Sequence, residues 1–320
     1  MTDKYIYAVT SIRGKELKLL SRTFMEQLLA SPDEASALSL LRDKGWGEDG
    51  QSAEEILAGE EEKTWKVIRE LVPDMSVFDV FLYENDFHNL KAAIKETLTQ
   101  GTHPGIYIGQ GTVPWETMQK ALTERDFGKF PERMKRAAKE ALDVLLTTRD
   151  GQLCDCIIDS AALDAIRQAG KASGSELLAL YGELRCVTGD INIAYRAGKN
   201  GKDKAFLLRS LAPCETLNRD SLAEAAVHGE DALFAYLERT PYKAAVAELS
   251  DSVAAFERWC DDLLIEKIRP QRTNPFGLDP LAAYILARRN EIKTARIILT
   301  GKRNDLPDDM IRGRIRKTYV

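Results

Sequence analysis

The chain has 320 residues, of which 44% are hydrophobic and 30% are charged, and its formal net charge is -5. These values are typical of a globular protein with a well-charged surface. They argue against an integral membrane protein, because the apolar residues form short periodic groups and never the run of about 20 that a membrane helix requires. The N-terminus mixes charged and apolar residues and does not indicate a signal peptide. We therefore expect a cytosolic protein with one large domain or two to three small ones.

The charge is unevenly distributed along the chain. The segment from Glu266 to Val320 has 13 Lys and Arg against 6 Asp and Glu, a surplus of +7, so the remaining 265 residues carry -12. A basic end on an acidic body indicates a polar partner surface, which protein, lipid headgroups or nucleic acid would supply. A solvated helix face with surplus arginine is the alternative.

Helical periodicity dominates the N-terminal part of the sequence. Between residues 5 and 28, large apolar side chains recur every three to five positions, which predicts one helix with a buried stripe. Ser31 and Pro32 end this helix, and Pro32 suits the first position of the next one.

Two longer helices are predicted next. Ser52 and Glu55 have the spacing of a capping box, so a helix should begin there and run to about Val72, before Pro73. A second helix is expected from residue 74 to residue 98.

The rest of the chain also reads as helical. Residues 101–114 are expected to form a loop with a brief β-like run at residues 106–108. No segment alternates with period two for long enough to build a sheet, so the predicted fold class is all-α. Further helices are predicted to start at Pro114, Pro131, Ser175, Asn218, Asp251, Asp279-Pro280 and Pro307.

Three stretches of the sequence resemble one another at separations of about one hundred residues. They are residues 84–91, 189–196 and 291–297, and each combines polar residues with a following small or apolar one and a nearby cation. The similarity predicts three related helical units, at residues 1–110, 111–212 and 213–320.

Polar side chains within these three stretches interrupt otherwise apolar helices, and such groups need partners if they are buried. Asp86 is one of them. We interpret the group as a polar seam between the units, with a solvated helix face as the alternative. The residues of this predicted seam are Asn89, Lys91, Asn192, Arg196, Glu291 and Arg296.

No motif for catalysis or cofactor binding is found. The Gly-Lys pairs at residues 198–202 and 301–302 lack the spacing of a phosphate-binding loop, and no predicted strand precedes them. The histidines and cysteines show no metal-binding spacing, and no nucleophile elbow is present. We therefore predict no catalytic site, cofactor, metal or small-molecule substrate. The cysteines are interpreted as reduced and mostly buried (Cys154, Cys156, Cys186, Cys214 and Cys260).

The segment from Ala283 to Lys302 resembles the hallmark segment of the C-subunit family of V/A-type ATPases, whose member in eukaryotic vacuolar pumps is called the d subunit. The shared pattern is an apolar helix with Tyr284, then Glu291 followed by an aliphatic residue, and an Arg-aliphatic-aliphatic step into Gly301-Lys302. Residues 86–91 are similar to the signature of the family's first repeat.

The resemblance extends over essentially the whole chain, with two departures. Residues 190–196 are similar to the family's second-repeat signature, and the C-terminal residues 306–320 look like the ending of bacterial members. Thr294 and Ala295 stand where the family usually has Asn and an aliphatic residue, and a second glycine is absent soon after Lys302.

The resemblance implies a funnel of three similar helical bundles in a pseudo-threefold arrangement, with no active site of its own. One end of the funnel would sit on the membrane rotor ring, and the other would receive the central shaft formed by the D and F subunits. The protein would then transmit torque between ATP turnover and ion movement. Its place would be cytoplasmic and peripheral, in contact with the membrane only through the ring.

The basic end of the chain supplies the predicted contact with these partners, at Arg312, Arg314 and Arg316. The competing hypothesis is a helical adaptor or scaffold unrelated to ATPases, which would keep the fold but not the pattern at residues 291–302. Binding of nucleic acid is disfavoured, because the chain has a pI of about 5.5 and its aromatic residues are not interleaved with the basic ones.

Overall fold

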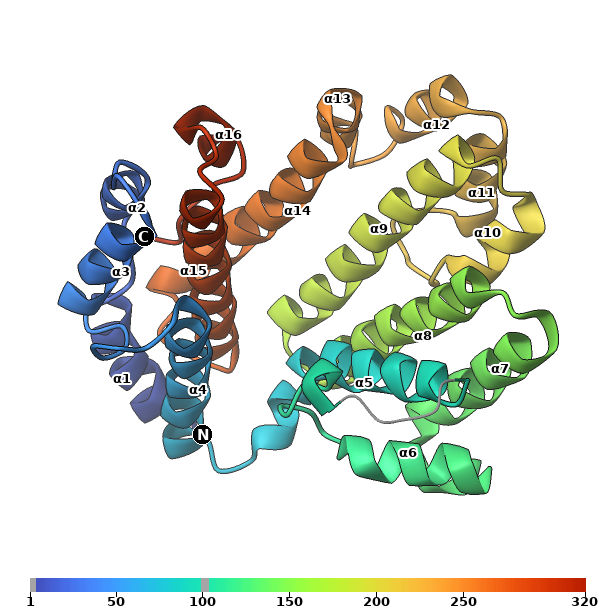
Figure 1. The fold of residues 1–320 in the computed structure, drawn as a ribbon, viewed down its shortest axis with the longest axis horizontal. Helices are drawn as coiled ribbons and strands as arrows, with labels where there is room; N and C mark the ends of the chain where they lie inside the picture. The colour runs from blue at the N-terminus through green and yellow to red at the C-terminus, as the bar shows by residue number, and fades with distance from the viewer. Residues whose placement is uncertain (1–3, 99–103) are drawn as a thin grey trace. The chain divides into compact units, whose positions relative to one another are not determined.

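The computed structural model describes residues 4–98 and 104–320, and their regular structure consists of α-helices and short 3-10 helices without a strand (Figure 1). For these residues the predicted all-α fold is confirmed. The chain divides into two compact units. Unit 1 combines Met1–Met75 with Ala247–Val320, and unit 2 is the continuous segment Ser76–Val246. The division into units at residues 1–110, 111–212 and 213–320 stays a prediction.

Unit 1 is built around one long helix, α15 (Asp279–Arg303), which is buried over most of its length. Its apolar side chains, among them Ile292, Ala295 and Ile298, form a core with side chains of helices from the N-terminal part of the chain. The other elements of this unit are α1 (Ile6–Glu16), α2 (Arg22–Leu29), α3 (Glu34–Asp43), α4 (Ala53–Leu71), α14 (Val253–Ile268), η4 (Arg269–Thr273) and α16 (Asp308–Arg312).

Unit 2 is organised by two long helices, α8 (Gly151–Ala172) and α9 (Glu176–Lys199), which pack closely together (Figure 1). A Cβ atom on Gly170 would lie only 2.2 Å from the carbonyl oxygen of Leu178. Only glycine permits this approach of the two backbones. The other elements are η1 (Met75–Phe81), α5 (Tyr83–Glu96), η2 (Pro104–Ile106), α6 (Trp115–Glu124), η3 (Phe127–Lys129), α7 (Glu132–Thr148), α10 (Lys204–Ser210), α11 (Arg219–Val227) and α12 (Glu230–Leu237), and α13 (Ala244–Asp251) spans the boundary between the units.

The continuous helix predicted between residues 5 and 28 is wrong, because α1 ends at Glu16 and α2 begins at Arg22. Between them, Ser21 has an extended backbone, and its hydroxyl accepts a hydrogen bond from the Phe24 N–H. This is the geometry of a helix N-cap. The apolar periodicity does not reveal the break, because α2 resumes the same buried stripe.

The capping box predicted from the sequence is confirmed. The Ser52 hydroxyl accepts a hydrogen bond from the Glu55 N–H, the Glu55 carboxylate accepts one from the Ser52 N–H, and α4 ends at the C-cap Val72. Pro32, by contrast, does not begin the next helix. Asp33 is the N-cap of α3, because its carboxylate accepts the Ser36 N–H and Pro32 has no such side chain.

Two other local predictions need correction. The helix expected from residue 74 starts late, because residues 75–81 form the 3-10 helix η1 and α5 begins only at Tyr83. The β-like run at residues 106–108 forms no strand, and its first residue ends η2.

The later helix starts lie close to their predicted places. Ser175 and Asn218 are N-caps whose side chains accept backbone N–H groups, while α14 is capped by Ser252 and not by Asp251. No helix in the described part of the chain is both long and apolar enough to cross a membrane. The remaining predicted starts coincide with the first residues or caps of their helices (Pro114, Pro131, Asp279-Pro280 and Pro307).

Candidate functional site

The first of the three similar stretches lies in α5, where Asp86 is completely buried. Its carboxylate accepts hydrogen bonds from the backbone N–H groups of Thr112, at 2.7 Å, and Val113, at 3.1 Å, and it pairs with the Arg133 guanidinium at 3.1 Å. These contacts fix the segment that leads into α6. A buried carboxylate with three such donors is well compensated for its lost hydration.

The second stretch places Asp190 in the same situation within α9. Its carboxylate accepts the backbone N–H of Ala212 at 2.8 Å, in the segment that leads into α11. No arginine or lysine forms an ion pair with it among the described residues, and burial raises the pKa of Asp190 to about 8. The carboxyl group is therefore largely protonated at neutral pH.

The third stretch places Glu291 in the middle of α15, where it accepts the backbone N–H of Leu20 just before α2 begins. Arg288 pairs with Glu291 at 2.7 Å and with Glu60 of α4 at 2.5 Å, and its guanidinium lies over the Trp46 ring. Burial raises the pKa of Glu291 to about 7, while the adjacent Arg288 opposes that rise. This network joins three segments inside unit 1.

Asp86, Asp190 and Glu291 thus have one task in common. Each is a buried carboxylate on a helix, Asp86 in the first turn of α5 and the other two near the middle of α9 and α15, and each binds the backbone of the segment that precedes another helix. We call these three residues the carboxylate anchors. Their role is structural, since each binds the protein's own backbone.

The predicted seam residues of unit 2 lie around these anchors with different surroundings. Asn89 holds the backbone of Ile108 with both ends of its amide, donating to the carbonyl oxygen at 2.9 Å and accepting the N–H at 2.8 Å. Lys91 pairs with Asp159 of α8 at 2.6 Å. Asn192 is half-buried and Arg196 is exposed.

In unit 1, the two predicted seam residues differ in burial. Glu291 is buried in the network described above, whereas Arg296 lies on the exposed side of α15. The hydrogen bond from Arg303 lowers the pKa of Glu54, and the charge of Arg296 adds a smaller effect in the same direction. The side chains that share the seam pattern in sequence therefore differ in burial. The carboxylate anchors are the recurring feature, and the cations are not.

The Gly301-Lys302 pair at the end of α15 has a packing role. A Cβ atom on Gly301 would lie 2.6 Å from the Ile311 side chain, so glycine is needed for α16 to pack there. The Lys302 ammonium is buried and pairs with Asp308 at 2.7 Å, in the first turn of α16. Neither residue is available to a nucleotide phosphate.

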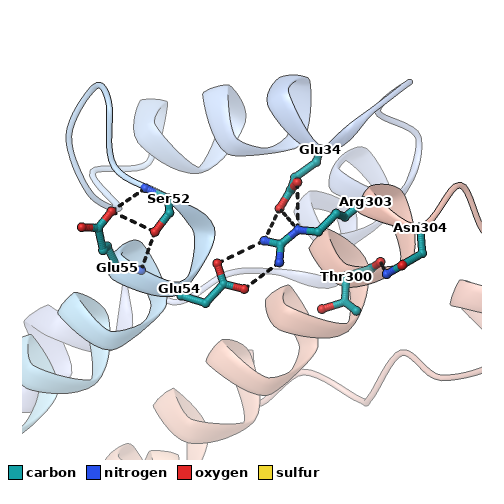
Figure 2. Close-up of polar contacts among 7 residues, drawn as sticks. All are labelled: Glu34, Ser52, Glu54, Glu55, Thr300, Arg303 and Asn304. Atoms are coloured by element: carbon teal, nitrogen blue, oxygen red, sulfur yellow. Dashed lines mark hydrogen bonds and ion pairs between the residues drawn. The ribbon is translucent and has the colours of Figure 1, made fainter. Parts of the chain in front are cut away.

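The next residue, Arg303, binds the beginnings of two other helices (Figure 2). Its guanidinium pairs with Glu34 at 2.6 Å and with Glu54 at 2.8 Å, and these acids lie in the first turns of α3 and α4. Planar bidentate pairing suits an arginine between two carboxylates. Figure 2 also shows the capping box of Ser52 and Glu55 on the same helix end.

The three arginines predicted to bind a partner have unequal exposure. Arg312 is exposed and lies 3.1 Å from Asp309 and 3.5 Å from Glu26, and Arg314 is also exposed. Arg316 is buried and pairs with Asp261 of α14 at 2.8 Å. Its guanidinium thus holds the C-terminal segment to α14, and Arg312 and Arg314 remain accessible.

A groove of about 630 Å³ lies beside these arginines in unit 1. Its walls come from α2, α14 and the C-terminal segment, and they combine apolar with charged side chains. Tryptophan, methionine and arginine, which are enriched at protein interfaces, all line it. The principal lining residues are Arg22, Met25, Arg258, Trp259, Arg269, Arg312, Ile315 and Lys317.

Comparison with known proteins decides the family. Residues 8–314 match the family model of the ATP synthase (C/AC39) subunit. The chain belongs to this family. It is 25% identical to the C subunit of the V-type sodium ATPase of Enterococcus hirae, with 96% of this chain and 97% of that protein aligned. It is 24% identical to the C subunit of the A-type ATP synthase of Methanocaldococcus jannaschii, over 96% of this chain and 85% of that protein.

A third relative is the C subunit of the V-type ATP synthase of Thermus thermophilus, which is 22% identical over 93% of this chain and 94% of its own length. Each of the three relatives therefore aligns with this chain from near its beginning to near its end. Proteins of this family are components of rotary ATPase complexes, so the predicted family is confirmed.

The chemistry available in this member of the family is limited. The described residues contain no group of three or more His, Cys, Asp or Glu side chains placed to hold a metal ion. Burial raises the pKa of the Cys154 thiol to about 11 and that of the Cys214 thiol to about 12, which disfavours the nucleophilic thiolate. Gly198 is likewise used in packing, because its Cβ would lie 2.7 Å from the Ala226 carbonyl oxygen.

One functional residue is absent from the seam predicted from the sequence. The predicted seam residues include Glu291, and Asp86 is noted beside them. In α9, however, the prediction names Asn192 and Arg196 and leaves out Asp190. The available signal was a carboxylate inside an apolar helix, at Asp190 beside Ile191. Such a residue is costly to bury and therefore needs a donor from elsewhere.

Proposed function

We propose that this chain is the non-catalytic central-stalk subunit of a V/A-type rotary ATPase or ATP synthase. It links the shaft formed by the D and F subunits to the membrane rotor ring and transmits torque between them. The observation that carries the proposal is the alignment with C subunits of such enzymes along 93 to 96% of this chain. An adaptor unrelated to ATPases is disfavoured by the same alignment.

A non-catalytic role is supported by the use of the candidate catalytic groups in packing. Gly198 and Gly301 each admit a neighbouring segment, and Lys302 is neutralised by Asp308. Torque passes through a rigid body, and buried ion pairs such as Arg288 with Glu60 tie α15 to α4. We expect the chain on the cytoplasmic side, held to the membrane through the ring.

The pseudo-threefold arrangement of helical bundles belongs to the same proposal. It is supported by the carboxylate anchors on α5, α9 and α15, because each of them accepts a hydrogen bond from a backbone N–H group of a distant segment. A strict internal repeat would place an anchor of this kind in each bundle. An experimental structure of the assembled complex tests the arrangement directly.

Purification of the complex from membranes tests the proposed function. We expect this chain to co-purify with catalytic, shaft and ring subunits. Deleting its gene should leave ATP hydrolysis by the catalytic part intact and abolish ATP-driven ion transport. Stoichiometric binding of ATP to the isolated chain at micromolar concentration, or its absence from the purified complex, would contradict the proposal.

A further inference from the structure

A second groove, with a volume of about 490 Å³, lies wholly within unit 2. Helices α7 and α8 form two of its walls, and α10 with the segment that follows it forms the third. Its floor combines the small or medium apolar side chains of Ala137, Ile157, Ala161 and Ala165, of which Ala161 is the most accessible, with the polar Ser160. Small residues along a helix leave room for larger side chains of another molecule.

The rim of this groove carries four arginines against two acids, Glu140 and Asp164, and no lysine. Both acids are already engaged, because Glu140 pairs with Arg209 at 2.9 Å and Asp164 pairs with Arg167 at 2.8 Å. Of the other three rim arginines, Arg133 pairs with the buried anchor Asp86.

Two rim arginines therefore keep most of their charge for a partner. Arg136 has a side chain that is 95% exposed, and its nearest carboxylate, that of Glu140, is 3.9 Å away. Arg219 is exposed and forms no ion pair within the described part of the chain. In a chain with a net charge of -5, this is a local positive surface beside an apolar floor.

The chemistry of the groove selects one kind of occupant. Arginine forks bind carboxylates in a bidentate manner, and arginine without lysine is typical of a protein interface. The lining offers no sheet edge for an added strand and no aromatic platform for a proline-rich segment. Of the modes that remain, recognition of an acidic segment by arginines fits the rim, and a helix laid in the groove adds contacts with the alanines of the floor.

We propose that this groove binds an acidic amphipathic helix of a partner subunit. Its apolar side chains, spaced three or four residues apart, lie over Ala161 and Ala165, and its flanking carboxylates pair with Arg136 and Arg219. The inference rests on the proposed function, because the partner is another component of the rotary complex.

Photo-crosslinking in the intact complex tests this inference. A benzophenone amino acid in place of Leu208, a half-buried lining residue, should crosslink to another subunit, and mass spectrometry should locate the crosslink in an acidic amphipathic helix. The same probe at Ala232, outside the groove, is the control position. Absence of a crosslink from Leu208, or a crosslink to phospholipid or to a segment without acidic residues, would overturn the inference.

Two variants show whether the proposed contacts hold the helix. The double variant R136E/R219E should lower crosslinking from position 208 at least fivefold, whereas R239E, at an exposed arginine elsewhere in unit 2, should not. Ala161→Phe fills the floor without changing the charge and should have the same effect as the double variant. Unchanged crosslinking in both would sink the inference.

The proposed function is tested separately from the groove. Identification of the proteins in the purified complex tests the proposed function before any crosslinking is done. A chain that co-purifies with the ATPase but gives no crosslink from the groove contradicts the inference alone. A chain that is absent from the ATPase contradicts the proposed function, and the proposed partner helix falls with it.

Discussion

The carboxylate anchors differ in how their charge is balanced. Asp86 has Arg133, and Glu291 has Arg288, but Asp190 has a backbone N–H as its nearest donor and no ion-pair partner among the described residues. A buried carboxyl group without a counter-ion takes up a proton, because neutralisation is less costly than burying the charge. The three anchors therefore respond differently to pH.

Substitution of Asp190 separates its hydrogen bond from its charge. Asp190→Asn keeps an acceptor for the Ala212 N–H and should change the free energy of unfolding by less than about 1 kcal/mol at pH 6, where the native carboxyl group is mostly protonated. Asp190→Ala leaves that N–H buried without a partner and should cost about 1–3 kcal/mol. Urea unfolding measures both. Equal losses for the two variants would assign the effect to packing alone.

The raised pKa of Asp190 also fixes the sign of a pH effect. The ordinary pKa is 3.8 and the native one about 8, so between these values the native state binds more protons than the unfolded state. Stability contributed by this group is therefore full below pH 4 and is lost as the pH rises toward 8. Relative to D190N, the wild-type protein should lose stability between pH 5 and pH 8. Parallel urea curves at these pH values check it, and a constant difference would contradict it.

Among the elements, the long helices were predictable and the breaks between short ones were not. The capping box of α4 follows from Ser52 and Glu55, because both partners lie within one turn. The break before α2 combines the local N-cap Ser21 with Glu291, which lies far away in the sequence and accepts the Leu20 N–H. Local patterns carry no information about such a distant acceptor. For Asp190, the sequence shows a carboxylate inside an apolar helix but not which backbone N–H it binds.

The α8–α9 contact provides a test at the scale of elements. Gly170→Ala would place a Cβ atom 2.2 Å from the Leu178 carbonyl oxygen, so the two helices must separate. A loss of about 1–3 kcal/mol is expected from this overpacking. Gly59→Ala in α4 is the matched control, since nothing lies within 4 Å of its added Cβ, and it should stabilise the protein by about 0.5–1 kcal/mol. Thermal and urea unfolding of both variants check the prediction, and a stable G170A variant would contradict it.

At the scale of the whole molecule, the exposed arginines near the C-terminus are the proposed contact with a partner subunit. Reversal of charge in R312E/R314E should weaken assembly with ring or shaft subunits at least tenfold at low salt, and the difference from the wild-type protein should shrink at high salt, because exposed charges are screened. Both side chains are exposed, so the melting temperature should change little. Pull-down with purified partners and a thermal melt measure the two effects.

The buried Arg316 supplies the contrast to this double variant. R316E breaks its pair with Asp261 and should destabilise unit 1, which shows as a lower melting temperature. Unchanged capture of partners by a folded R312E/R314E variant would remove Arg312 and Arg314 from the interface and leave the family assignment intact.

The two compact units predict different behaviour of fragments. Residues 76–246 form a continuous unit with its own core, so this fragment should fold alone and unfold cooperatively. Residues 1–75 should remain largely unfolded alone, because their core is completed by α15. Circular dichroism of the two fragments during heating measures this. A cooperative transition in the N-terminal fragment would contradict the division.

The placement of α15 has a consequence for synthesis on the ribosome. Chains emerge from the N-terminus onward, and domains generally fold as units when their segments become available. The helices of residues 4–71 appear first, but the apolar side chains of α15 that complete their core appear almost last. The segment that forms unit 2 emerges between these two events, so unit 2 can fold completely while the N-terminal helices still lack the core that α15 supplies. A message truncated before residue 279 would thus yield one folded unit carrying an unfolded, apolar N-terminal segment, which chaperones and proteases recognise readily.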